Sequence, residues 1–268
     1  MPARTGFRLF GRPVPAALYP APRAQWNDPE SVLGELSGQA PPPAELDPCF
    51  RAEGLFNGPV FAMQRIRLRP RLAIDCRPGW YFDSMNTCEK LELERRFLAR
   101  LPPRRLWRNG AGRTPAAGIS TIVAWPGREG WLALAGRMKA KSMPHRAGQI
   151  HVIPSGMFSP PFSVTENVRR ELAEEAGLAL PPHGLRLAGI AVNLENLRPE
   201  ICTVLLLDRA PAAVPREEFE PELCAVPLPC GNAAPPPALA EAVFAVPAAA
   251  ALLLASRLLR RAGIRSSG

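Results

Sequence analysis

The stretch PSGMFSPPFSVTENVRRELAEEAGL, residues 154–178, decides how the rest of the chain is interpreted. Its first half is rich in proline and glycine, which is typical of a loop. Its second half has apolar residues at helical spacing from residue 164 to 176 and then Gly177, which predicts an amphipathic helix with a glycine C-cap. The face expected to pack on a sheet consists of Val168, Leu172 and Ala176.

Carboxylates gather on another face of this helix. Glu171, Glu174 and Glu175 stand at positions i, i+3 and i+4, so at about 100° per residue they share one sector with Asn167. Crowded carboxylates repel each other, and a hard divalent cation such as Mg²⁺ relieves that repulsion. A solvated acidic helix face is the alternative. Gly156 favours a metal site, because a glycine between an apolar strand and this helix lets a backbone carbonyl approach the metal.

These residues resemble the signature box of the Nudix hydrolases. The box reads Gly, five residues, Glu, seven residues, Arg-Glu, a bulky aliphatic residue, any residue, Glu-Glu, any residue, Gly and a bulky aliphatic residue. The positions that match at the correct spacing are Gly156, Arg170, Glu171, Leu172, Glu174, Glu175, Gly177 and Leu178. The first glutamate of the box is replaced by Phe162. With the strands around it and a final helix, the resemblance covers residues 118–263.

The resemblance implies an α/β fold, namely an α/β/α sandwich with a mixed sheet. It also implies hydrolysis of a nucleoside diphosphate linked to another group, with Mg²⁺ as cofactor and Mn²⁺ as a substitute. Glu171, Arg170 and Glu174 are then the expected catalytic residues, with Glu171 positioning and deprotonating the attacking water and Arg170 orienting the carboxylates. The expected metal ligands are Glu171, Glu174, Glu175, the backbone carbonyl of Ser155, and Glu200.

Phe162 is the main departure from the family pattern, since the missing glutamate supports the metal cluster in Nudix enzymes. Glu166, near the start of the helix, is one possible substitute. Glu200 and, after it, Glu195 are others, because both flank a turn that enters a strand. A solvent-exposed turn charge is the alternative for each. The departure also leaves open a catalytically degenerate Nudix domain that binds or senses a nucleotide.

Four residues are expected to contact the substrate: Gly156, Arg137, Lys139 and Asn167. Arg137 and Lys139 follow a predicted strand and would reach the diphosphate, or else form an ordinary charged strand exit. Residues 55–61 (LFNGPVF) and 187–193 (LAGIAVN) resemble Nudix proteins that hydrolyse UDP-sugars and carry an N-terminal extension. A UDP-sugar such as UDP-glucose is therefore the first substrate to consider.

The chain divides into three parts by composition. Residues 1–46 are rich in proline and predict a poorly ordered arm with one short helix near residues 28–36. Residues 47–117 predict a small α+β extension with strands at 58–68 and 72–74 and a helix at 88–101. Residues 118–263 predict the Nudix domain. Its expected strands lie at 119–125, 131–135, 149–153, 185–192 and 201–207, its proline-rich connection at 209–237 and its last helix at 247–261.

The composition excludes several other classes of protein. The 268 residues hold no apolar run near the ~20 needed to span a bilayer, and the N-terminus lacks the apolar core of a signal peptide. None of the six cysteines forms a CxxC pair, so a zinc site is not expected. A cytoplasmic protein that acts on a small nucleotide without a membrane partner fits these features. Its oligomeric state is left open.

A basic run around Trp107, residues 95–113, offers a third interpretation. The formal net charge is +9, and residues 1–117 alone carry +7. Such a run is typical of a nucleic-acid patch, of a clamp on substrate phosphates, or of a solvated helix face in an arginine-rich chain. Nucleic-acid binding is the least favoured of the functions, because the excess charge lies outside the Nudix region.

Overall fold

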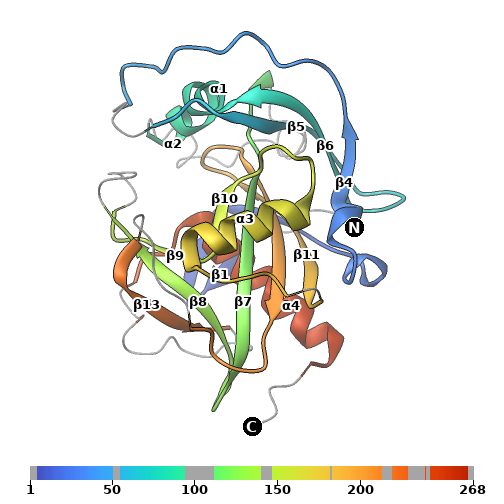
Figure 1. Cartoon of the computed structure of the whole chain (residues 1–268), viewed down its shortest axis with the longest axis vertical. Helices are drawn as coiled ribbons and strands as arrows, with labels where there is room; N and C mark the ends of the chain where they lie inside the picture. The colour runs from blue at the N-terminus through green and yellow to red at the C-terminus, as the bar shows by residue number, and fades with distance from the viewer. Residues whose placement is uncertain are drawn as a thin grey trace.

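The computed structural model describes residues 5–50, 55–93, 112–139, 147–181, 183–212, 219–228, 239 and 242–264. In this part of the chain the largest element is a mixed sheet of eight strands (Figure 1). Its main path is β13 (Phe219–Pro227), β8 (Gly130–Met138), β7 (Gly118–Gly127), β12 (Pro199–Leu206), β11 (Leu185–Asn193) and β3 (Ala16–Pro20). Two short strands, β9 (Ile150–Val152) and β10 (Ser155–Met157), pair with β8 and β7. Only β7 and β12 run parallel in this sheet as described.

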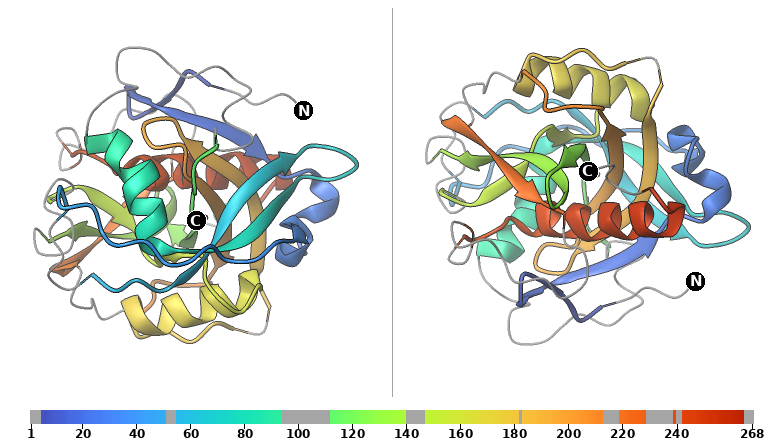
Figure 2. Two further views of the ribbon diagram at one scale, coloured as in Figure 1. Left: turned by 90° about the horizontal axis from the view of Figure 1, so that it is seen from above. Right: turned by 90° about the horizontal axis from the view of Figure 1, so that it is seen from below.

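One helix covers each face of this sheet. Helix α3 (Val164–Ala176) contacts β7 and β10, whereas α4 (Val246–Ala262) contacts β11, β12, β3, β7 and β9. The two views in Figure 2 show these helices on opposite sides of the strands. The expected α/β/α sandwich with a mixed sheet is therefore confirmed.

Helix α4 forms because its sequence combines start and stop signals with a small-residue face. Pro247 stands in the first turn, where its missing N–H is not needed, and Gly263 ends the helix with φ +67°. Ala248 to Ala251 are buried, and their small side chains let the helix lie close to the sheet. In the part of the chain that the structure describes, no helix is both long and apolar enough to cross a membrane.

The expectation of a poorly ordered arm over residues 1–46 is wrong for the described part of that segment. Strand β3 pairs antiparallel with β11 and forms one edge of the main sheet. Its approach requires Gly189, which has φ +149° and whose Cβ would lie 2.3 Å from the Tyr19 carbonyl oxygen. The hairpin β1 (Phe7–Leu9) and β2 (Arg12–Val14) precedes β3. These strands are too short to show a period in the sequence, so only pairing reveals them.

A second, three-stranded sheet contains β4 (Leu33–Leu36), β6 (Ala73–Trp80) and β5 (Pro59–Arg67) in this order. It joins the arm to the expected extension, since β4 comes from one and β5 and β6 from the other. Before β4, the short helix expected near residues 28–36 is the 3-10 turn η2 (Pro29–Val32), preceded by η1 (Arg23–Gln25). After β6, the expected 88–101 helix begins earlier, at residue 81. It comprises α1 (Tyr81–Ser84), the π-helical turn η3 (Met85–Glu89) and α2 (Lys90–Leu93).

Two other expected segments are only partly described. The proline-rich connection at 209–237 contains β13, which pairs with β8 and which the sequence did not predict. The basic run at 95–113 lies outside the described residues up to residue 111.

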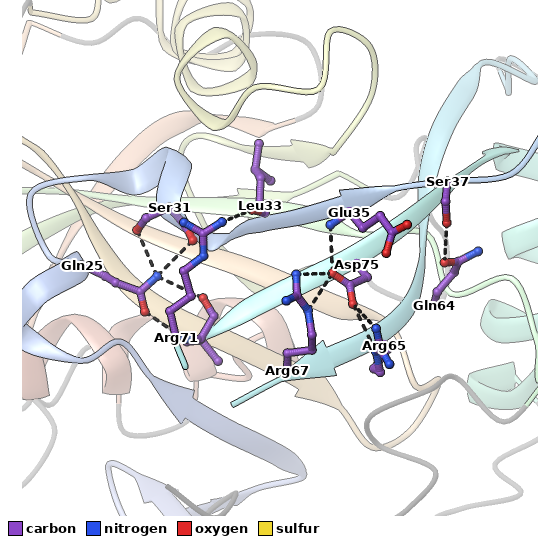
Figure 3. Close-up of polar contacts among 11 residues, drawn as sticks. Gln25, Ser31, Leu33, Glu35, Ser37, Gln64, Arg65, Arg67, Arg71 and Asp75 are labelled. Carbon is purple, nitrogen blue, oxygen red and sulfur yellow. Dashed lines mark hydrogen bonds and ion pairs between the residues drawn. The ribbon is translucent and has the colours of Figure 1, made fainter. Parts of the chain in front are cut away.

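Asp75 on β6 ties the small sheet together (Figure 3). It is 2% exposed and accepts hydrogen bonds from Arg67 Nη2 (2.7 Å), Arg65 Nη2 (2.9 Å) and the Glu35 N–H (2.9 Å). Burial raises the pKa of this carboxyl, but the hydrogen bonds from Arg67, Glu35 and Arg65 outweigh it and the pKa is lowered. The charged form of Asp75 is therefore the one that the fold stabilises.

Asp75→Asn is expected to destabilise the protein by about 1–3 kcal/mol at pH 7, because the two guanidinium groups lose the carboxylate charge and one of its two acceptor oxygens. Since the folded pKa of Asp75 is lowered, its stabilisation is complete above the unfolded pKa of about 4 and is lost as the pH falls below it. Urea unfolding of both proteins at pH 7 and near pH 3 measures this, with exposed Glu35→Gln as the control. An equal difference at both pH values would contradict the linkage.

Candidate active site

Helix α3 is placed on the sheet by caps at both ends. The Ser163 side chain accepts a hydrogen bond from the Glu166 N–H (3.3 Å), and Gly177 adopts the left-handed conformation with φ +64°. The predicted apolar face of Val168, Leu172 and Ala176 is fully buried. The carboxylates of the helix are thereby turned towards β10 and towards solvent.

The carboxylate of Glu171 occupies the space where a side chain of residue 156 would stand. A Cβ atom at Gly156 would lie 2.3 Å from Glu171 Cδ and 2.4 Å from each carboxylate oxygen. Glu171 is 9% exposed, and its Oε1 accepts a hydrogen bond from Arg170 Nη2 (3.0 Å). The lack of a side chain at Gly156 therefore leaves room for the Glu171 carboxylate against β10.

Glu175 meets the same strand one residue earlier. Its Oε2 accepts a hydrogen bond from the Ser155 N–H (2.8 Å), and its side chain is buried. On β10 the backbone groups of Gly156 face β7, because it pairs with Ile119 and the flanking bonds of residues 154 and 158 also go to β7. The carbonyl of Ser155 therefore faces away from β7, as its N–H does, towards the Glu175 carboxylate.

Arg170 holds the loop between β10 and α3 against the helix. Besides Glu171, its guanidinium donates to Asn167 Oδ1 (2.9 Å) and to the carbonyl oxygens of Pro160 (3.4 Å) and Met157 (3.5 Å). Arg170 thus contacts both Glu171 and the loop, and its role in orienting a catalytic carboxylate stays a prediction.

Asn167 does not have the substrate-binding role that the sequence suggested. It is fully buried, and its Nδ2 donates to three loop carbonyls, those of Ser159, Pro161 and Ser163, at 2.8–3.0 Å. Its Oδ1 accepts from the Ser159 N–H (3.0 Å). An amide whose atoms all serve the loop is a structural group, so the prediction for Asn167 is corrected.

Glu200 lies on the other face of the sheet from Glu171. It pairs with Gly118 on β7 and accepts a hydrogen bond of 2.5 Å from Ser120 Oγ. Gly156 instead pairs with Ile119, and neighbouring residues of a strand point to opposite faces. The strand register thus places Glu200 away from Glu171, and a role for Glu200 as a metal ligand stays a prediction.

Glu174 differs from the buried residues Glu171 and Glu175, because it is exposed on the solvent side of α3. Among the described residues, no group of three or more His, Cys, Asp and Glu side chains is arranged to hold a metal ion. Of the five predicted ligands, Glu171, Glu175 and Ser155 lie around β10, and Glu174 is exposed beside them.

The basic residues expected to hold phosphates lie at the end of strand β8. Arg137 is exposed, and its Nη1 donates to the Gly148 carbonyl (3.0 Å). Lys139 follows β8 and is half-buried. The contact of Arg137 and Lys139 with a diphosphate therefore stays a prediction.

Phe162, at the position of the missing box glutamate, belongs to an aromatic cluster. Its ring lies 4.9 Å from that of Phe61 on β5, edge to face, and 5.6 Å from that of Phe158. Phe158 is fully buried. The residue that interrupts the box therefore joins the α3 loop to the small sheet by packing.

A buried ion pair that the sequence did not reveal joins η3 to the start of β12. Arg198 pairs with Glu89 of η3, and its Nε donates to the Ala116 carbonyl (3.3 Å). The side chain of Glu89 is 0% exposed and that of Arg198 12%. The partners are 109 residues apart, so no local pattern could have paired them.

Of the cysteines whose side chains are described, Cys49 is exposed, whereas Cys76, Cys88 and Cys202 are buried. Burial raises the pKa of Cys88 to about 12 and also raises those of Cys76 and Cys202. Thiols with such values stay protonated near neutral pH and are poor nucleophiles and ligands.

Comparison with known proteins finds similarity in structure alone. No family model matches the sequence, and no curated protein sequence matches it. The Nudix domain of Shewanella oneidensis NrtR, solved with ADP ribose, is 14% identical, with 61% of this chain and 97% of that chain covered and a TM-score of 0.43. A MutT protein from Methanosarcina mazei Go1 is 20% identical (56% and 95% covered, TM-score 0.40). A C. elegans Ap4A hydrolase is 15% identical (56% and 99%, TM-score 0.39).

Phe162→Ala is expected to destabilise the protein by about 1–3 kcal/mol, because half-buried aromatic contacts are lost. Phe162→Glu, which restores the glutamate of the box, should destabilise the protein more, since a carboxylate would face two aromatic rings. Denaturant unfolding measures both variants, with Phe56→Ala as the control because Phe56 is 80% exposed. Wild-type stability of Phe162→Glu would contradict the packing role.

Proposed function

We propose that the chain is a Mg²⁺-dependent Nudix hydrolase that cleaves the diphosphate bond of a nucleoside diphosphate linked to another group. The observation that carries the proposal is the convergence of box residues on β10. Glu171 lies over Gly156, Glu175 binds the Ser155 N–H, and Arg170 binds Glu171. Neighbouring side chains of α3 thus surround one short backbone segment of β10.

The groups gathered at β10 suit a hard cation. Two carboxylates, from Glu171 and Glu175, and the carbonyl of Ser155 are oxygen donors, which Mg²⁺ prefers and Mn²⁺ also accepts. Exposed Glu174 adds a carboxylate from the solvent side, where a substrate would arrive. When bound, the metal supplies charge neutralisation on the diphosphate and a lowered pKa of a coordinated water.

The chain's own residues would orient the reaction. Glu171, held by Arg170, would accept the proton of the attacking water, and the anchored loop would keep this carboxylate in place. The water forms a new P–O bond and the bridging P–O bond breaks, which releases two phosphate-bearing products. Arg137 and Lys139 would bind the diphosphate from the end of β8. The basic excess of the chain would attract an anionic substrate to this face.

A UDP-sugar such as UDP-glucose is the proposed substrate class in detail. It rests on the resemblance of residues 55–61 and 187–193 to UDP-sugar hydrolases with an N-terminal extension. Both stretches lie in ordered parts of the fold, in and before β5 and in β11. Phe61 of the first stretch contacts Phe162 in the aromatic cluster.

A catalytically degenerate domain that binds a nucleotide is the second candidate. It is favoured by the aromatic packing of Phe162 and by the two buried carboxylates, where a full box would supply more. Tight nucleotide binding without turnover would distinguish this function from hydrolysis.

Incubation with Mg²⁺ and a panel of nucleoside diphosphate sugars, followed by chromatography of the products, is expected to show cleavage. Glu171→Gln and Glu175→Gln should lower kcat by about 10²–10⁴-fold, because each removes a carboxylate at β10. Glu166→Gln is the matched control, since Glu166 lies on the same helix, is exposed and pairs with exposed Arg169. A wild-type protein inactive on the whole panel would contradict hydrolysis.

Gly156→Ala tests the close approach separately. The added methyl would displace the flexible Glu171 carboxylate and leave the backbone of β10 in place. Stability should therefore fall by only about 1 kcal/mol, whereas activity should fall about as far as in Glu171→Gln. Thermal unfolding and steady-state kinetics on the same sample measure both. Retained activity in Gly156→Ala would show that Glu171 is not needed at this position.

A further inference from the structure

Glu30, a residue of the N-terminal segment, sits on the first turn of α3. Its Oε1 accepts hydrogen bonds from the Thr165 N–H (2.7 Å) and Ser163 Oγ (3.0 Å), and its Oε2 accepts one from the Val164 N–H (2.9 Å). Glu30 and Val164 are 134 positions apart in the chain. The start of the candidate catalytic helix is therefore held by a carboxylate from outside the Nudix region.

The physical effect of this contact is larger than that of an ordinary cap. The first N–H groups of a helix have no partner within the helix, and the helix dipole places positive potential there. Ser163 satisfies one such group, the Glu166 N–H, and Glu30 satisfies two more while adding a negative charge. Together they fix both the position and the rotation of the first turn.

The segment that carries Glu30 is itself rigidly attached (Figure 3). Asp28 caps η2 by accepting from the Ser31 N–H (3.2 Å). Gln25 is 5% exposed and binds both backbone groups of Leu72, at 2.9 and 3.0 Å. Turn η2 also contacts α3, β11 and β6. Glu30 is thus presented by a built surface and not by a loose strand of chain.

Glu30 also stands beside the position where the box departs from its pattern. Phe162 is the residue before Ser163, and its ring packs on Phe61 in place of a carboxylate. The N-terminal part of the chain thus makes two contacts here. Phe61 of β5 packs on the ring of Phe162, and Glu30 of η2 binds the residues that follow Phe162.

We infer that Glu30 is a positioning residue of the candidate active site, a carboxylate from the N-terminal segment that fixes the first turn of α3 and thereby the carboxylates further along this helix. The inference rests on the proposed function. Glu171 follows Val164 by two turns, or about 10 Å at 1.5 Å per residue, so a shift or rotation of the first turn reaches its carboxylate. Displacements near 1 Å lower rates strongly when groups must stay aligned. Glu30 acts through the helix and does not touch the reacting groups.

The test compares Glu30→Ala and Glu30→Gln with Glu35→Gln, at a temperature where unfolding curves show every variant folded. Glu35→Gln is the matched control, because it removes one exposed carboxylate from the same segment. The measurements are kcat and KM on the substrate found in the panel and, independently of turnover, Mn²⁺ affinity by electron paramagnetic resonance. Glu30→Ala is expected to lower kcat about 10-fold with KM changed less than about twofold, and to weaken Mn²⁺ binding. Glu30→Gln should recover part of both, since its amide oxygen still accepts from the helix.

The outcomes separate this inference from the proposed function. An active wild type whose Glu30→Ala variant keeps kcat and Mn²⁺ affinity while losing thermal stability overturns the positioning role and leaves hydrolysis standing. An inactive wild type that binds Mn²⁺, with weaker binding in Glu30→Ala, supports positioning and overturns hydrolysis. A wild type that neither turns over nor binds Mn²⁺ overturns both.

Discussion

The site depends on the close approach of helix α3 to the backbone of β10. Glu171 fills the space that a side chain at Gly156 would need, and Glu175 binds the N–H next to it. Two buried carboxylates side by side repel each other and lose hydration, so they stay charged only where donors or a cation compensate them. Arg170 and the β10 backbone provide part of this compensation. A divalent cation would complete it, which ties the fold to the proposed chemistry.

The N-terminal half of the molecule acts as a support for this helix. Glu30 binds its first turn and Phe61 packs on Phe162 in the preceding loop, while Glu89 of η3 pairs with Arg198, the residue before β12. Each contact joins residues distant in the chain and each is at least partly removed from water, where hydrogen bonds and ion pairs are costly to break. The extension is therefore integral to the geometry of the box, which explains how a box with an altered position keeps its shape.

Local patterns in the sequence were sufficient for the central elements. The period of residues 164–176 predicted α3 because Val168, Leu172 and Ala176 must leave water together, and Gly177 must end the helix. The alternating and β-branched runs predicted β7, β8, β11 and β12 for the same reason. β3, β13 and β10 were missed because they are short or interrupted by proline, so their stability comes from neighbouring strands and not from their own residues.

For the site, the sequence by itself determined which carboxylates share a helix face, since the 3.6-residue period leaves no choice. It also determined that a glycine precedes them at the spacing of the box. Only the tertiary structure decided that Asn167 serves the loop, that Glu200 lies on the opposite sheet face and that Glu30 joins the helix. Those outcomes depend on strand register and on which distant segments pack together, because a shift of one residue in a strand sends its side chain to the other face.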